Sequence, residues 1–89
     1  MQLDTLRERI DVIDEELVKL FCERMKVSEE IGEYKRLNGM DVLDVDREAK
    51  KIETVRKMAG DDYCDEVEDL FRQIMVISRR MQESTINEK

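Results

Sequence analysis

The fold of this chain is decided by residues 3–37, which read LDTLRERIDVIDEELVKLFCERMKVSEEIGEYKRL. Apolar side chains recur there at alternating steps of three and four residues. That spacing is the 3.5-residue period of a helix that packs lengthwise on another helix. We call this set the apolar stripe, and its members are Leu3, Leu6, Ile10, Ile13, Leu17, Leu20, Val27, Ile31 and Tyr34. The pattern predicts one long helix whose stripe is buried.

The one gap in the apolar stripe is filled by a charged residue, Arg24. Burying a guanidinium costs several kcal/mol of lost hydration unless an anion meets it. Three interpretations are open at this point. A carboxylate of the same chain pairs with Arg24, its stem lets the charge reach water, or an anionic ligand binds inside a helical bundle.

The composition favours one all-α domain and excludes several kinds of function. The 89 residues include no proline, three glycines and 44% charged residues, which suits helices. A net charge of −7 argues against general nucleic-acid binding, which needs a cationic surface. Because the chain has no histidine and only two cysteines, a zinc site and a histidine-based catalytic triad within it are excluded.

Nothing in the sequence indicates a membrane span or export. No apolar run approaches the roughly 18 residues of a spanning helix, and residues 1–4 lack the basic start of a signal peptide. Cys22 and Cys64 are too few for a disulfide scaffold and are expected to be small apolar helix residues. We therefore expect a reduced cytoplasmic protein.

Helix-ending signals predict where the first two helices lie. The first is expected over about residues 3–37, with Asn38-Gly39 as its left-handed end. The second is expected over about residues 45–59, with Asp44 as its N-cap and Gly60 just past its end.

A third helix is predicted over about residues 62–83, with Asp61 or Asp62 as its N-cap. The tail after Gln82 is expected to fray. One face of this helix is apolar and consists of Val67, Leu70, Phe71, Ile74, Ile77 and Met81.

The first helix is too long for a lone compact subunit. Its 35 residues would span roughly 52 Å, whereas a compact chain of this length has a diameter of roughly 30 Å. The overhang predicts a second copy that covers the apolar stripe, in an intertwined homodimer with twofold symmetry. A kink at Gly32 is the alternative, because no proline is present.

Polar side chains gather on the helix faces that should be buried. Ser78 and Gln82 interrupt the apolar face of the third helix and lie four residues apart. Lys35 follows Arg24 by eleven residues, so both leave one face of the first helix about 16 Å apart. Taken singly, each has an ordinary explanation, such as a boundary position or a cation that answers the helix dipole.

Two further groups of charged residues complete the set. Asp44, Arg47 and Glu48 lie at the start of the second helix, where capping and surface pairing are the ordinary explanation. Arg7 lies seventeen residues, or roughly 25 Å, before Arg24. An antiparallel copy of the first helix, centred near residues 15 and 16, would bring its own Arg7 level with Arg24.

The ordered set of these residues resembles the all-helical class of chorismate mutases over about residues 3–84. The matching segments are LRERID at 6–11 with Ile13-Asp14, ER at 23–24, IGEYK at 31–35, VLDVDRE at 42–48, and FRQIM at 71–75 with Ser78 and Gln82. The family's active-site positions hold the expected residue types here, namely Arg7, Arg24, Lys35, Asp44, Arg47, Glu48, Ser78 and Gln82.

The resemblance implies an isomerase that converts chorismate to prephenate in aromatic amino-acid biosynthesis. The reaction is an intramolecular Claisen rearrangement that needs no metal or cofactor. The enzyme confines a flexible dianion and stabilises charge on its ether oxygen. Lys35 and Gln82 would donate to that oxygen.

The remaining residues would bind the substrate. Arg24 and Arg7 of the second copy would hold the two carboxylates. Arg47 and Ser78 would assist them, and Glu48 with the Asp44 backbone would hold the ring hydroxyl. We count Arg24, Lys35, Gln82 and Glu48 as catalytic.

The sequence departs from the family pattern at three positions, and two rival functions are considered. Asp41 stands where proline is common, and Val76 and Ile77 stand where acidic residues are common. One rival is a lyase on the same scaffold that releases pyruvate from isochorismate. The other is a non-catalytic helical module that dimerises or regulates a partner. Association with another aromatic-pathway enzyme is also considered.

Overall fold

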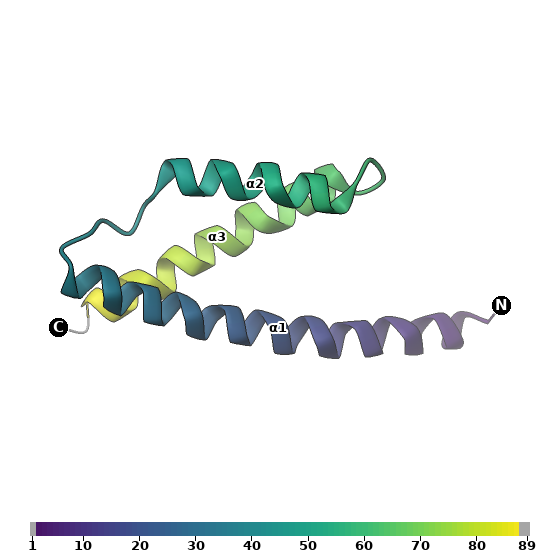
Figure 1. Ribbon diagram of the computed structural model, residues 1–89. Coiled ribbons are helices and arrows are strands. Elements are labelled where there is room, and N and C mark those ends of the chain that lie inside the picture. The colour runs from purple at the N-terminus through teal and green to yellow at the C-terminus, as the bar shows by residue number, and fades with distance from the viewer. Residues whose placement is uncertain (1, 88–89) are drawn as a thin grey trace.

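Three helices make up the computed structural model, which describes residues 2–87 (Figure 1). They are α1 (Leu3–Leu37), α2 (Val45–Ala59) and α3 (Cys64–Asn87), and the described residues contain no strand. α3 packs against both other helices and lies between α2 and the C-terminal part of α1. The predicted all-α fold is confirmed. Over the described residues, no helix has the length and apolar content needed to cross a membrane.

α1 and α2 begin and end where the sequence signals place them. The side chain of Asp44 accepts a hydrogen bond of 3.0 Å from the Arg47 N–H, so Asp44 is the N-cap of α2. Gly60 follows the end of α2 with a φ of 75°, a left-handed value that favours glycine.

The predicted bounds of the third helix are wrong at both ends. α3 begins at Cys64, because residues 61–63 form a turn and the Val67 N–H donates to the Tyr63 carbonyl. Neither predicted aspartate therefore caps it. α3 continues to Asn87 instead of fraying after Gln82, since Thr85 and Ile86 are half-buried and Thr85 Oγ1 donates to the Met81 carbonyl. Residues 88 and 89 of the predicted tail lie outside the described residues.

The apolar stripe of α1 is largely exposed within a single chain, in line with the prediction that one subunit alone leaves part of it uncovered. Leu17 and Leu20 are 54% and 60% exposed, whereas the buried residues of α1 are Met25, Ser28 and Gly32. The chain measures 55 × 27 × 14 Å with a radius of gyration of 16.2 Å, against about 12 Å for a compact chain of this length. The predicted overhang is thus present, and α1 extends away from the other helices (Figure 1).

Gly32 does not break α1, which is one uninterrupted helix from Leu3 to Leu37. Its role is a close approach of two helices. A Cβ at Gly32 would lie 2.8 Å from both the Cα and the carbonyl oxygen of Gln82. The absent side chain therefore lets the end of α3 lie directly on α1.

Candidate functional site

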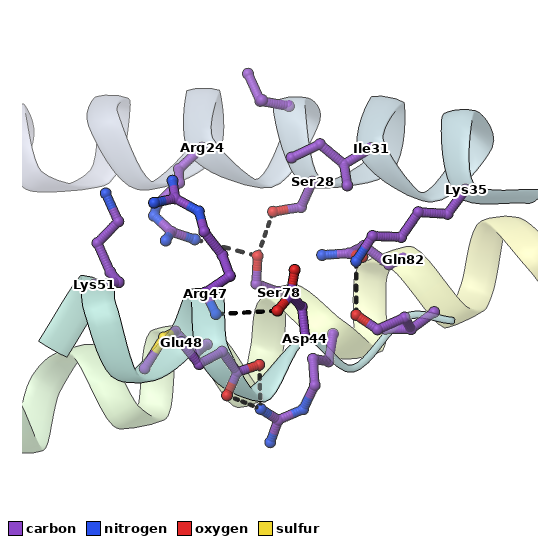
Figure 2. Close-up of a pocket in the computed structure, with 14 residues that line it drawn as sticks. Arg24, Ser28, Ile31, Lys35, Asp44, Arg47, Glu48, Lys51, Ser78 and Gln82 are labelled. Atoms are coloured by element: carbon purple, nitrogen blue, oxygen red, sulfur yellow. Dashed lines mark hydrogen bonds and ion pairs between the residues drawn. The ribbon is translucent and has the colours of Figure 1, made fainter. Parts of the chain in front are cut away.

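A cavity of about 490 Å³ lies between α1, the start of α2 and the C-terminal part of α3 (Figure 2). Seven of the eight predicted site residues line it, and Arg7 does not. The complete lining is Arg24, Val27, Ser28, Ile31, Lys35, Val42, Asp44, Arg47, Glu48, Lys51, Met75, Ser78, Arg79 and Gln82. Residues far apart in sequence thus meet because α3 brings α1 and α2 together.

Arg24 is held at the cavity without a carboxylate. Its Nη1 donates a 3.1 Å hydrogen bond to Ser78 Oγ, and its guanidinium carbon lies 5.9 Å from the centre of the Phe71 ring. No carboxylate in the described part of the chain forms an ion pair with it. Burial, and then the charge of Arg47, lower the pKa of the Arg24 guanidinium. Of the three interpretations above, pairing with a carboxylate of this chain is therefore wrong over the described residues.

Ser28 supports this arrangement, and sequence reasoning missed it. Its hydroxyl forms a hydrogen bond with Ser78 Oγ, and the residue is 2% exposed. A chain of hydrogen bonds between α1 and α3 therefore runs from Arg24 through Ser78 to Ser28 (Figure 2). The available signal was spacing, because Ser28 follows Arg24 by one helical turn.

Lys35 and Gln82 lie at the opposite end of the cavity from Arg24 (Figure 2). Lys35 Nζ donates a 2.7 Å hydrogen bond to the Val42 carbonyl, which lies in the loop before α2. Gln82 is 8% exposed, and its Oε1 has no hydrogen-bond partner among residues 2–87. Because an amide oxygen accepts, the unpartnered Oε1 favours a ligand or side chain that brings a donor to this wall.

The start of α2 supplies one acidic wall of the cavity. The side chain of Asp44 is used in capping the helix. Glu48 faces Arg79 of α3, whose Nη1 donates to both carboxylate oxygens at 2.5 and 2.6 Å. Arg79 and Lys51 also line the cavity, and no pattern in the sequence selects either residue. In the sequence, both residues stand at what look like ordinary surface positions of a helix. They reach the cavity only because α2 packs against α3.

Comparison with known proteins identifies the family. The family model described as chorismate mutase type II matches residues 6–83. The chain belongs to this family. The chorismate mutase of Methanocaldococcus jannaschii is 31% identical over 65 residues, which cover 73% of this chain and 66% of that protein. The intracellular chorismate mutase of Mycobacterium bovis is 38% identical over 60 residues, which cover 67% of this chain and 57% of that protein.

A longer relative matches as well. The T-protein of Enterobacter agglomerans is 33% identical over 76 residues, which cover 83% of this chain. The match covers 20% of the T-protein, so the chain spans about a fifth of that relative's length.

The cavity of this type II family member is locally cationic although the whole chain is acidic. Its lining contains five cations, namely Arg24, Lys35, Arg47, Lys51 and Arg79, and two anions, Asp44 and Glu48. The difference is +3, against −7 for the chain. The cavity can therefore attract and hold a small anion of charge −2. Within the described residues no cluster of acidic or sulfur side chains is suited to a metal ion.

Proposed function

We propose that the chain catalyses the rearrangement of chorismate to prephenate within the aromatic pathway. The observation that supports this most is the cavity itself, in which a cationic end and a donor-bearing end face one small volume. Chorismate needs both, because its two carboxylates must be bound while its ether bond breaks. Family membership supports the same reaction.

The cationic end is proposed to bind the substrate carboxylates. Arg24 is already fixed by Ser78 and the Phe71 ring, so little side-chain freedom is lost when an anion binds. Arg47 lies close enough for its charge to lower the pKa of Arg24, and a dianion between them would relieve that repulsion. Charge-assisted hydrogen bonds from guanidinium groups are strong and directional.

The end of the cavity with Lys35 and Gln82 is proposed to stabilise the transition state. As the C–O bond lengthens, negative charge grows on the ether oxygen, and Lys35 and Gln82 would both donate to it. Lys35 would turn from the Val42 carbonyl, while the Gln82 amide group is already buried at the wall. One such donor contributes roughly 3–4 kcal/mol. Two donors and the restriction to a chair-like conformer approach the roughly 8 kcal/mol that a modest enzyme needs.

A second copy of the chain is proposed to complete the site with its Arg7. The support is the exposed apolar stripe, since Ile10, Ile13 and Leu17 are each more than half exposed in one chain. Roughly 25 Å of helix separates Arg7 from Arg24, so one chain cannot use both for one ligand. Two antiparallel copies of α1 would cover each other's stripe and bring Arg7 of one copy to Arg24 of the other.

The test is a direct assay of the purified chain. Chorismate consumption is followed by absorbance, and prephenate is detected as phenylpyruvate after acid treatment. We expect turnover, and a fall in kcat of about 100-fold or more for Lys35→Ala and for Gln82→Ala. Lys57→Ala is the matched control, because Lys57 is exposed and its only hydrogen bond and ion pair among the described residues are with Glu53.

Two results would contradict the proposal. One is the absence of chorismate turnover by the well-folded chain. The other is release of salicylate and pyruvate from isochorismate at a higher rate than chorismate is consumed, which would make the lyase the better description. A cytoplasmic location and association with another aromatic-pathway enzyme stay predictions.

A further inference from the structure

Arg79 forms the closest ion pair in the cavity, and it does so with a proposed substrate-binding residue. Arg79 Nη1 bridges both oxygens of Glu48 at 2.5 and 2.6 Å, from α3 to α2. Both side chains are shielded, with 29% and 25% of their surface exposed. Arg79 follows Ser78 directly, so the residue that accepts from Arg24 and the residue that holds Glu48 are neighbours on α3.

We propose that Arg79 is a positioning residue that acts through Glu48 on the ring hydroxyl of the substrate. This rests on the proposed function above. An ionised carboxylate offers about four lone-pair sites, and the bridge from one nitrogen takes one site on each oxygen. The remaining sites stay free to accept the hydroxyl hydrogen. The bridge fixes the carboxylate plane and therefore the direction from which the hydroxyl can approach.

The charge of Arg79 also favours binding of the substrate. Glu48 lines a cavity that is proposed to bind a dianion, and an unpaired carboxylate there would repel it. With Arg79 bridging it, the Glu48–Arg79 pair is neutral overall. Glu48 can then accept from the hydroxyl without opposing the carboxylates that Arg24 and Arg47 would hold.

A second arginine shows what a purely structural link between the same helices looks like. Arg56 of α2 donates to Glu68 and Asp65 of α3 at 2.7 and 2.9 Å. This pair joins α2 and α3 next to the turn between them, and Arg56 does not line the cavity. Arg56→Met is therefore the matched control for Arg79→Met, because each variant removes one α2–α3 arginine.

The experiment measures kcat, KM and thermal stability for wild type, Arg79→Met, Arg79→Lys and Arg56→Met. For Arg79→Met we expect KM to rise about 10-fold while kcat stays within about threefold, since the hydroxyl contact is made in both the ground and transition states. Arg79→Lys should recover part of the loss, because an ammonium restores the charge but bridges less well. Arg56→Met should lower the melting temperature and leave both kinetic constants unchanged.

A double-variant test separates action through Glu48 from direct contact with substrate. If Arg79 acts through Glu48, then Arg79→Met should add less than about twofold to the KM of Glu48→Gln. A full 10-fold rise in that background would overturn the proposal, as would an Arg79→Met enzyme with the kinetics of Arg56→Met. Wild type that fails to consume chorismate would instead defeat the proposed function, so the two failures are distinguishable.

Discussion

The two parts of α1 follow one sequence pattern and have opposite surroundings. Residues 21–37 pack on α3, bury Met25, Ser28 and Gly32, and line the cavity with Arg24 and Lys35. Residues 3–20, which we call the N-terminal arm, have no buried residue and extend beyond the rest of the chain (Figure 1). In residues 21–37, α3 covers a face next to the apolar stripe, because the stripe members Val27, Ile31 and Tyr34 are 51%, 41% and 62% exposed. The 3.5-residue period therefore predicts a helical contact that no helix of the same chain supplies over the described residues.

The largest effect on activity is expected from substituting one arginine in each part of α1. Arg7→Ala changes the N-terminal arm and Arg24→Ala changes the cavity, and each homodimer should lose about 100-fold or more of its kcat/KM. Mixing the two under conditions of subunit exchange should restore about a quarter of wild-type activity. Half of the dimers are then mixed, and each mixed dimer has one intact site and one doubly altered site.

The controls for mixing are each variant carried alone through the same exchange step, and exchange is verified by mass-tagged subunits. If exchange is complete and activity stays at the level of the single variants, Arg7 and Arg24 do not meet across an interface. The N-terminal arm would then need another explanation.

A charge in the N-terminal arm should separate the subunits. Leu17 lies near the centre of the proposed antiparallel contact and is 54% exposed in one chain. Leu17→Glu should destabilise a dimer by about 3–6 kcal/mol, because two leucine side chains lose their burial. Sedimentation and thermal melts should report a shift to monomer and a lower melting temperature.

Lys19→Glu is the matched control for Leu17→Glu. It places the same side chain on the same turn, but at an exposed position outside the apolar stripe. Equal behaviour of the two variants would mean that the stripe is not an interface.

The same distinction explains what the sequence could predict. Helices follow from local rules, so the bounds of α1 and α2 and the Asp44 cap came from sequence signals. Arg24 stood out because a charge broke an apolar period. Arg79 was missed because its importance lies in a contact between helices, which no local pattern encodes. Ser28 was missed although it follows Arg24 by one helical turn, because its contact with Ser78 depends on how α3 packs.

The start of α3 was misplaced for a related reason. Asp61 and Asp62 are good capping residues, but the turn that holds them continues to Tyr63. Arg56, reaching from α2 to the Cys64 carbonyl and to Asp65, ties the first residues of the helix. A tertiary contact thus helps set a boundary that local propensity places two residues earlier.

A moderate effect is expected from filling the close approach between α1 and α3. In Gly32→Ala the new Cβ would meet the Gln82 backbone at 2.8 Å, and backbone cannot rotate away as a side chain can. Overpacking of this kind costs about 1–3 kcal/mol, partly offset by the better helix propensity of alanine. We expect a lower melting temperature together with a lower kcat, because Gln82 is displaced from the cavity.

Glu29→Ala is the control for Gly32→Ala, since Glu29 is exposed one turn earlier on the same part of α1. An unchanged kcat in Gly32→Ala would show that α3 can shift without disturbing Gln82. The cavity would then tolerate a shift of α3 relative to α1, although the two helices pack closely at Gly32.

The smallest effect concerns pH and the α2–α3 link at Glu68. Hydrogen bonds from Arg72, and then Arg56, lower the pKa of the Glu68 carboxyl below its ordinary 4.5. A carboxyl whose pKa is lower in the folded chain stabilises it above the unfolded pKa, and this stabilisation is lost as pH falls through the folded pKa. Wild type should therefore lose melting temperature more steeply than Glu68→Gln as the pH falls below 4.5. The effect is small because solvent reaches Arg72, which is 60% exposed.

Both helices belong to one chain, so the difference between wild type and variant should not change with protein concentration. A difference that grew on dilution would mean that this link, like the N-terminal arm, depends on a second copy.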